Sequence, residues 1–433
     1  MQTTHLKNKK VLIITYYWPP AGGPGVQRWL KFVKYLPEFS IQPHVFVPEN
    51  PNYPLVDHQL ENEISAHAIV LKKKIAEPYQ WASIFSKNKT KNLSAGIISN
   101  KRKQTWIEKA LLWVRGNFFI PDARVLWVKP SVDFLQSYIK EHSIDTIITT
   151  GPPHSLHLIG MELKKRNEIQ WIADFRDPWT TIGYHKELKL TSWADNEHKR
   201  MEAEVLNTAD EIIVTSPSTK REFEQITQQP ITLITNGYDI ERIEKKPLDE
   251  KFTLSHIGTL LSNRNPRILW KVLSEIIQEN EIFAKDFVLQ FIGKVSDEII
   301  DTLKEFRLGT YLQNRGYLSH EEAIVAQRSS QVLLLIEIDS PETVGIIPGK
   351  LFEYLAAERP ILALGPEDAD FSKIIFNTNT GTFCTYDDKE RIKRTVLHYY
   401  NLYKNNQLQI KGIGIQYFSR KKLTEKLVLL LKK

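Results

Sequence analysis

The chain has 433 residues, 42% hydrophobic and 25% charged, and this length predicts two domains because single cores rarely grow beyond ~300 residues. Its single cysteine excludes an intrachain disulfide and favours a reducing compartment, and neither an apolar run of ~18 residues nor a signal peptide is evident. The net charge of +7 suits a phosphate-bearing substrate or an anionic membrane surface but does not by itself indicate nucleic acid.

The first predicted strand, Val11 to Thr15, is a short β-branched run typical of buried parallel strands. The Gly-rich stretch YYWPPAGGPGVQR and a helical pattern follow it, although the dinucleotide fingerprint GxGxxG is absent. Gly22 and Gly23 would let the backbone approach a ligand closely. The alternative is a plain turn between a strand and a helix.

Further buried strands alternate with helical patterns, which predicts a mostly parallel sheet with helices on both faces. In the first half of the chain these strands are expected at His44 to Val47, Ile69 to Leu71, Asp145 to Thr150, Trp171 to Asp174, Glu211 to Thr215 and Thr232 to Thr235.

The stretch from Glu77 to Pro130 interrupts this alternation. It contains a basic segment, then an amphipathic helix with apolar residues spaced from Trp106 to Val114, then the aromatic sequence GNFFIPDARVLW. Basic and aromatic residues together suit a membrane interface, which predicts peripheral contact through residues 87–128. The alternative is an insertion whose apolar face packs on its own domain.

Two polar clusters stand at strand ends, where open α/β sheets bind ligands: TGPPHS at 150–155 and ADFRDPW at 173–179. His154 could act on a hydroxyl proton, because the unperturbed pKa of histidine lies near neutrality. Asp174, Arg176 and Asp177 could orient a sugar or hold a phosphate. In the alternative interpretation Arg176 only pairs with the two aspartates and the histidine is structural.

A second α/β series follows a linker around Lys245 to Pro247. Its strands are expected in FTLSHIG, FVLQFIG, VLLLIEI and PILALG. Thr259 and the run SNRNPR come between the first of these strands and a helix, so Arg264 and Arg267 could reach a diphosphate. The alternative is a pair of surface arginines.

The stretch GIIPGKLFEYLAAERPILALG, residues 345–365, predicts a tight loop, a helix from Leu351 to Ala357 and a buried strand. Backbone N–H groups at the helix start, from Gly349 and Leu351, would form an anion site together with Lys350. Glu353 lies one turn away and is well placed for sugar hydroxyls. The final segment, 417–433, is expected to form an amphipathic helix.

These pieces together resemble the retaining GT-B glycosyltransferases of family 4. The resemblance covers nearly the whole chain except residues 77–130. Its markers, in chain order, are the GG loop, ADEIIVTS, TNGYD, HIGTL, RGYLSHEE and KLFEYLAAERPIL. The DFRDPW and GPPHS clusters are similar to a bacterial branch that acts in surface-polysaccharide assembly.

The resemblance implies an α/β protein of GT-B type, with two Rossmann-like domains facing each other across a cleft and a C-terminal helix crossing back. An acceptor-binding domain would span residues 1–246. A domain binding the nucleotide sugar would span 247–412, and residues 413–433 would pack back toward the first domain.

The resemblance also assigns roles by position. Glu353 matches the second carboxylate of the family's E-x7-E motif, which holds the ribose, whereas Gly345 replaces the first, and Glu342 could substitute for it. Thr259 stands where the family has an arginine, so Arg264 beside Lys350 becomes the candidate for the diphosphate. The other matched positions are Gly22 and Gly23 beneath the diphosphate, and His154 near the anomeric carbon.

The expected reaction transfers a sugar with retention from a nucleoside diphosphate sugar to a glycan or lipid-linked acceptor in the cytoplasm. Positive charge and helix dipoles, not a metal or other cofactor, would stabilise the leaving phosphate. The D-x-D sequence at 368–370 is interpreted as a helix start. Nucleic acid is not an expected partner. The alternatives are a nucleotide-sugar epimerase and a non-catalytic protein that binds sugar nucleotides.

Overall fold

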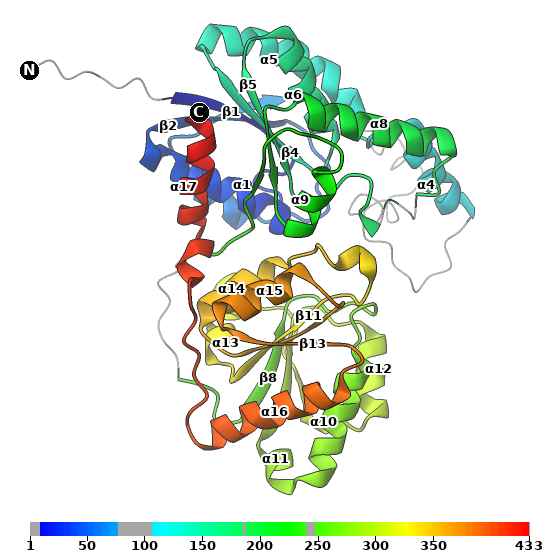
Figure 1. Cartoon of the computed structure of the whole chain (residues 1–433), viewed down its shortest axis with the longest axis vertical. Coiled ribbons are helices and arrows are strands. Elements are labelled where there is room, and N and C mark those ends of the chain that lie inside the picture. Colours follow the sequence, from blue (N-terminus) through cyan, green and yellow to red (C-terminus); the bar gives the residue numbers. More distant parts are fainter. Residues whose placement is uncertain (1–8, 77–105, 184, 186–187, 240–246, 433) are drawn as a thin grey trace, which may run out of the picture. The chain divides into compact units, whose positions relative to one another are not determined.

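The computed structural model describes residues 9–76, 106–183, 185, 188–239 and 247–432. It divides into two compact units (Figure 1). Unit 1 consists of Met1–Thr235 and Arg420–Lys433, and unit 2 of Asn236–Ser419. The basic part of the predicted insertion, including Lys101 to Lys103, lies outside the described residues.

Unit 1 is built on a parallel sheet in the order β3-β2-β1-β4-β5-β6-β7. Its central strands β1, β4 and β5 are almost wholly buried, as expected of a sheet that helices cover on both faces. The strands are β1 (Lys9–Ile14), β2 (Ile41–Pro48), β3 (Ile69–Lys73), β4 (Thr146–Gly151), β5 (Gln170–Phe175), β6 (Glu211–Val214) and β7 (Ile231–Leu233).

The helices of unit 1 bury apolar stripes on the two faces of this sheet. One face is covered by α5 (Val128–His142), α6 (Ser155–Arg166) and α8 (Ser192–Thr208), and the other by α1 (Pro24–Tyr35) and α17 (Arg420–Leu431). The remaining helical segments are η1 (Leu36–Phe39), η2 (His58–Glu63), α4 (Trp106–Phe118), η3 (Val125–Trp127) and α9 (Pro217–Phe223).

Unit 2 repeats the plan with a parallel sheet in the order β10-β9-β8-β11-β12-β13. Its strands are β8 (Phe252–Ile257), β9 (Phe287–Ile292), β10 (Leu312–Asn314), β11 (Val332–Ile336), β12 (Ile361–Gly365) and β13 (Gly381–Thr385).

Helices cover both faces of this second sheet as well. The core on one face includes residues of α10 (Arg267–Glu279), α12 (Asp297–Glu305) and α16 (Lys389–Lys404), and the core on the other face includes α13 (His320–Ser329), α14 (Gly349–Ala357) and α15 (Asp370–Thr378). Shorter segments are α11 (Glu281–Asp286), η4 (Gly309–Tyr311), η5 (Pro341–Thr343) and η6 (Ile415–Phe418).

The last helix, α17, belongs to unit 1 although the residues before it belong to unit 2. Its apolar face, including Leu423, Leu427 and Leu431, is buried in the same core as α1. Figure 1 shows α17 in red beside the blue α1. The expected return of the C-terminal helix is therefore confirmed, as are two Rossmann-like units.

Two strands were not expected from the sequence, β10 and β13. Each lies at an edge of the unit 2 sheet and is only partly buried, so neither shows the continuous apolar run that marked the central strands. The helix predicted from Leu351 begins two residues earlier, at Gly349, after Pro348 as its N-terminal flanking residue. The D-x-D sequence does lead into a helix, since α15 begins at Asp370.

Candidate functional site

The strand order of unit 2 reverses between β8 and β11, which have β9 and β12 on their outer sides. Ligands of open α/β sheets bind outside the carboxyl ends of the strands at such a point. Five polar residues near it form what we call the unit 2 charge cluster: His256, Arg264, Glu337, Lys350 and Glu353.

Arg264 and Glu337 form an ion pair at this reversal point. Oε1 of Glu337 accepts hydrogen bonds from Nε (3.0 Å) and Nη2 (2.8 Å) of Arg264, and from the N–H of Ile338 (2.9 Å). The Glu337 side chain is almost fully buried, whereas the Arg264 side chain is 25% exposed. Glu337 therefore fixes the guanidinium while part of it stays open to an anion.

Helix α14 is anchored against the end of β8. The buried hydroxyl of Tyr354 accepts a hydrogen bond from the N–H of Ile257 (2.9 Å). This places the first turn of α14 beside the strand, where the Lys350 ammonium lies 3.1 Å from Nε2 of His256. The helix N-terminus and the ammonium then present positive charge at one place.

Lys350 remains charged at neutral pH. Burial and the nearby charge of Arg264 lower the pKa of Lys350 to about 8, and the carboxylates Glu337 and Glu353 limit the decrease. Arg264 and Lys350 thus form a cationic pair of the kind that holds a phosphate or diphosphate.

Glu353 is half-buried one turn further along α14, and its Oε2 accepts a hydrogen bond from Nε2 of Gln327 on α13 (2.9 Å). The second carboxylate oxygen has no hydrogen bond to another described residue. Leu351, by contrast, is a core residue whose own N–H already donates to the Pro348 carbonyl (3.0 Å).

The other candidates of unit 2 lie on loops. Thr259, Glu342 and Gly349 are exposed, and Gly345 is half-buried between η5 and α14. The hydroxyl of Ser340 donates to the Glu342 carboxylate, which fixes Glu342 within its own loop. The hypothesis that Glu342 replaces the carboxylate missing at position 345 stays a prediction.

Asp174 in unit 1 is completely buried and fully hydrogen-bonded. It accepts from Nε (3.2 Å) and Nη2 (2.8 Å) of Arg28, from Nε1 of Trp29 (2.7 Å) and from the hydroxyl of Thr150 (2.9 Å). Nη1 of Arg28 donates to the carbonyl of Thr235 (2.8 Å). In this structure Asp174 holds α1 and two strands together and offers no exposed oxygen to a substrate.

Arg176 is likewise occupied by the protein. Its guanidinium donates to the carbonyls of Gly25 (2.9 Å), Gly151 (3.3 Å) and Pro152, which join the loops after β1 and β4. The neighbouring Asp177 is half-buried, and its carboxylate has no hydrogen bond to another described residue. Burial raises the pKa of Asp177, and the charge of Arg176 limits the increase.

His154 lies at the carboxyl end of β4, immediately before α6, and is nearly fully buried. Its ring is parallel to that of Trp179, with centroids 5.0 Å apart. Neither ring nitrogen has a hydrogen-bond partner among the described residues. Burial lowers the pKa of His154 to about 3, so the ring is neutral at physiological pH and can accept a hydrogen bond at one nitrogen but is a weak base.

The loop carrying Gly22 and Gly23 packs against residues 55–57. The N–H of Gly22 donates to the Leu55 carbonyl (2.9 Å), and a Cβ at Gly22 would lie 2.9 Å from Cγ of Leu55. Gly23 has a φ of 91° as the residue before α1, a conformation that favours glycine. These glycines have a local structural reason, and their contact with a ligand stays a prediction.

Several site residues were missed from the sequence. His256 lies near the carboxyl end of β8, in FTLSHIG, and Glu337 directly follows β11, in VLLLIEI; an ionisable residue at each strand end was the available signal. Glu202, buried on α8, accepts hydrogen bonds from the N–H groups of Trp179 (3.1 Å) and Thr180 (3.3 Å). It fixes the loop that packs on His154.

In the part of the chain that the structure describes, no group of three or more His, Cys, Asp or Glu side chains is arranged to hold a metal ion. Within the same residues, every helix is too short or too polar to cross a bilayer.

Residues 96–242 match the family model described as Glycosyltransferase Family 4. The match lies almost wholly in unit 1 and begins inside residues 77–130, the stretch that the motif resemblance left out. A search of curated protein sequences found no match.

Solved structures of similar fold cover nearly the whole chain. Anabaena Alr3699/HepE in complex with UDP and glucose has 12% identity and a TM-score of 0.60, over 98% of this chain and 100% of that one. WaaG, a glycosyltransferase involved in lipopolysaccharide biosynthesis, has 10% identity and a TM-score of 0.53, over 97% and 99%. A Listeria monocytogenes protein assigned as a UDP-N-acetylglucosamine 2-epimerase has 12% identity and a TM-score of 0.55, over 98% and 95%.

The two parallel sheets and these likenesses define a protein of the GT-B fold. The chain resembles the glycosyltransferases of family 4, and the family match supports sugar transfer from a nucleotide sugar.

Proposed function

We propose that the protein is a retaining glycosyltransferase that moves a hexose-type sugar from a nucleoside diphosphate sugar to a glycan or lipid-linked acceptor. The observation that carries this proposal is the cationic pair Lys350 and Arg264 beside Glu353 at the strand-order reversal of unit 2. The similar fold of WaaG and the DFRDPW and GPPHS clusters favour a role in bacterial cell-surface polysaccharide biosynthesis.

In the proposed reaction the bond between the anomeric carbon and the diphosphate oxygen breaks, and a bond to the acceptor oxygen forms on the same face. Negative charge develops on the leaving phosphate, where Lys350, Arg264 and the α14 N-terminus would stabilise it. The acceptor's proton passes to the leaving phosphate oxygen. Neutral His154 of unit 1 is proposed to assist by accepting a hydrogen bond at its one unprotonated ring nitrogen; both ring nitrogens are buried and have no partner among the described residues.

Donor binding is testable by titration with UDP and with inorganic pyrophosphate. If Lys350 holds the diphosphate, K350M should weaken both ligands. If Glu353 holds the ribose, E353Q should weaken UDP by about 10-fold or more but leave pyrophosphate unchanged. Lys271→Met is the control, because Lys271 is exposed on α10 outside the charge cluster. Equal weakening of pyrophosphate by K350M and K271M would contradict the assignment.

A thermal-shift screen against nucleotide sugars would then identify the donor. A ligand present at 100 times its dissociation constant should add about 2.7 kcal/mol to the free energy of unfolding. The anomeric configuration of the product, read by NMR, decides between retention and inversion.

The proposed reaction needs no metal, because Lys350 and Arg264 supply the positive charge. Turnover should therefore survive an excess of chelator. Loss of turnover that manganese restores would overturn this part of the proposal.

The likeness to a protein assigned as an epimerase supports a second candidate function, epimerisation of a nucleotide sugar. The two functions differ in their need for an acceptor. An epimerase would convert the nucleotide sugar when no acceptor is present, whereas a transferase would need the glycan or extracted lipid.

Helix α4 supports the further proposal of contact with an anionic inner-membrane leaflet. Trp113 and Phe118 on α4 and Trp193 at the start of α8 are exposed aromatic residues. Oδ1 of Asn117 accepts a hydrogen bond from the N–H of Thr191 (2.7 Å) and ties α4 to the start of α8. Exposed aromatic residues next to a basic segment suit a membrane interface.

Flotation with vesicles containing anionic lipid tests this contact. The double variant W113S/F118S should reduce binding, and charge reversal at Lys101, Arg102 and Lys103 should do the same. Phe376→Ser is the matched control, because Phe376 is an exposed aromatic residue of unit 2. Binding that is unchanged in all variants would remove the membrane proposal.

A further inference from the structure

His256 is fully buried in strand β8, and both of its ring nitrogens have polar partners. Nδ1 lies 3.0 Å from the carbonyl oxygen of Leu334 on the adjacent β11, and Nε2 lies 3.1 Å from Nζ of Lys350 on α14. A core histidine that only bridged two strands would need the first of these contacts and not the second.

These partners determine the ring's protonation state. A carbonyl oxygen can only accept, so Nδ1 carries the hydrogen, and an ammonium group can only donate, so Nε2 offers its lone pair. Burial and the charge of Lys350 hold the pKa of His256 well below its usual value, against the opposing effect of the Leu334 and Thr259 carbonyls. The neutral ring is therefore a fixed acceptor for the ammonium.

The surroundings of Lys350 leave its ammonium close to the backbone of β8. A Cβ at Gly258 would lie only 2.9 Å from Nζ, so the glycine leaves room for it. Besides His256, the charged groups that act on Lys350 are Arg264 after β8, Glu337 after β11 and Glu353 on α14 itself. His256 supplies the neutral hydrogen-bond acceptor, and it does so from a rigid strand.

We propose that His256 is a positioning residue of the donor site: its Nε2 fixes the Lys350 ammonium at the place where the diphosphate binds. This inference rests on the proposed function and deepens it. It explains why a buried strand carries an ionisable histidine beside its carboxyl end, in contact with Lys350.

The two nitrogens of the ring can be separated by substitution. In His256→Asn the side-chain amide stands near the Nδ1 position and can still donate to the Leu334 carbonyl, but it does not reach Lys350. In His256→Gln the longer amide places its oxygen near the Nε2 position and can accept from Lys350. A purely structural histidine should tolerate Asn better, whereas a positioning histidine should tolerate Gln better.

The primary measurement is the titration of Lys350, followed by competitive acylation at a series of pH values with mass-spectrometric detection of the labelled peptide. H256N should lower the pKa of Lys350 by about 1 to 2 units, because a hydrogen bond to a charged group is lost. In H256Q the pKa of Lys350 should stay within about half a unit of the wild-type value. An unchanged Lys350 pKa in H256N, or equal decreases in both variants, would overturn the proposal.

The ¹⁵N chemical shifts of the His256 ring in wild-type protein provide a second measurement that needs no variant to fold. The proposal requires an unprotonated, pyridine-type Nε2 and a protonated Nδ1. The opposite tautomer would overturn the proposal even if H256N proved too unstable to study.

Titration with UDP separates this inference from the proposed function. UDP should bind wild type and H256Q similarly and H256N about tenfold more weakly. If wild type does not bind UDP or pyrophosphate, the diphosphate role fails, and this part of the proposal fails with it. The acylation series and the ring tautomer still decide whether His256 positions Lys350.

Discussion

Asp174 and Asp177 are three residues apart at the end of β5 but have opposite surroundings. Asp174 is buried against Arg28, whose side chain is also buried, and Asp177 is half-buried with a pKa that burial raises. Their sequence context gave no way to tell them apart, since both lie within two residues of Arg176 in DFRDP. In the structure Asp174 stabilises the fold through its contacts with Arg28. Asp177 has no such contact among the described residues, and its role in substrate binding stays a prediction.

Asp174→Asn should therefore lower the free energy of unfolding by about 3 to 5 kcal/mol, because it leaves the Arg28 charge buried without its partner. Asp177→Asn should change it by less than about 1 kcal/mol. Urea denaturation measures both. If Asp177 contacts the acceptor, its variant should lose turnover while remaining folded. Equal destabilisation by the two variants would contradict this division of roles.

Gly258 is the second residue at which geometry gives a definite expectation. Its φ of 114° is strained for any residue with a side chain, and an added Cβ would lie 2.9 Å from Nζ of Lys350. Gly258→Ala should cost about 1 to 3 kcal/mol of stability and should also weaken UDP binding by displacing the ammonium.

Gly309→Ala is the control for Gly258→Ala, because the nearest atom to its added Cβ, Cγ of Lys304, is 3.9 Å away. Thermal denaturation and UDP titration compare the two. A Gly258→Ala variant that binds UDP like wild type would show that Lys350 can adapt, and would weaken its assignment to the diphosphate.

Among single residues, Lys350 and Glu353 could be proposed as donor-binding residues from the sequence, because a loop followed by a helix that starts with a lysine and a carboxylate is a local sequence pattern. The sequence did not allow His256 or Glu337 to be proposed. Their partners, Lys350 and Arg264, lie 94 and 73 residues away. The packing of α14 against the end of β8 brings Lys350 to His256, and the pairing of β8 with β11 brings Arg264 near Glu337.

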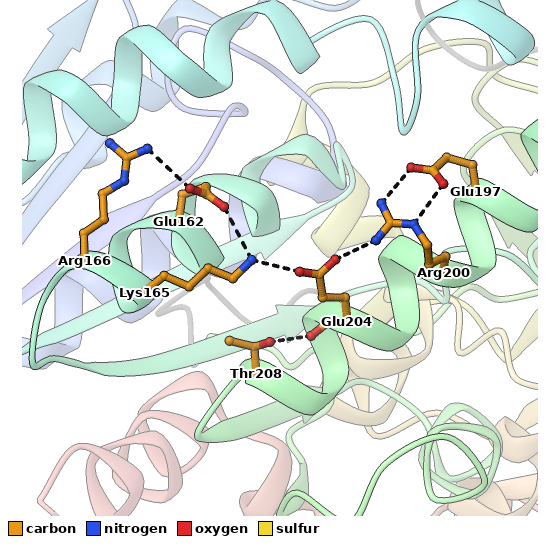
Figure 2. Close-up of polar contacts among 7 residues, drawn as sticks. All are labelled: Glu162, Lys165, Arg166, Glu197, Arg200, Glu204 and Thr208. Atoms are coloured by element: carbon orange, nitrogen blue, oxygen red, sulfur yellow. Dashed lines mark hydrogen bonds and ion pairs between the residues drawn. The ribbon is translucent and has the colours of Figure 1, made fainter.

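Helix α8 makes polar contacts on two faces, one toward the loop of Trp179 and one toward helix α6. Its inner face carries Glu202, which holds the Trp179 loop, and its outer face is joined to α6 by charged residues (Figure 2). Nζ of Lys165 on α6 lies 2.8 Å from Glu204, which also pairs with Arg200 (2.9 Å). These contacts lie near the surface, so water and salt screen them.

Glu204→Gln should lower the free energy of unfolding by less than about 1 kcal/mol at low salt, and the loss should shrink as salt is added. Glu197→Gln is the matched control, because Glu197 pairs only with Arg200 among the residues of Figure 2, within α8 itself. The difference between the two variants isolates the contact between helices. A loss that does not respond to salt would mean that Glu204 acts through something other than its charge.

Buried central strands could be predicted as elements, since strands such as β1 and β11 carry short apolar runs rich in Val, Leu and Ile. The edge strands β10 and β13 could not, because half-buried strands of mixed composition resemble loops. The amphipathic pattern after Trp106 did predict a helix, α4, and the exposure of Trp113 and Phe118 could not have been read from that pattern.

At the scale of the whole molecule, the repeated alternation of strands and helices was enough to predict two Rossmann-like units. The two sheets share the central order in which the first strand lies between the second and the fourth. The sequence places nine of the twelve histidines before residue 236, but it could not show which histidines are buried. The structure places five buried histidines in unit 1, where their titration has a consequence for stability.

Burial lowers the pKa of each of these five histidines, to about 4 for His44 and His185 and about 3 for His154. A histidine whose pKa is lower in the folded state binds fewer protons there than in the unfolded state. Its contribution is fully present above the unfolded pKa of ~6.5 and is lost as the pH falls toward the folded pKa. Within that pH interval each histidine can lower the free energy of unfolding by up to about 1.4 kcal/mol per pH unit.

Unit 1 should therefore lose stability between pH 7 and pH 5 more steeply than unit 2, where His256 is the one buried histidine among the described residues and has a lowered pKa. Asp177, Glu202 and Glu222 act with the opposite sign, because burial raises their pKa values, but the histidines outnumber them. Hydrogen exchange resolved by peptide would measure the two units separately in one sample, so unit 2 is the internal control. Parallel losses of protection in both units would mean that the buried histidines do not govern acid unfolding.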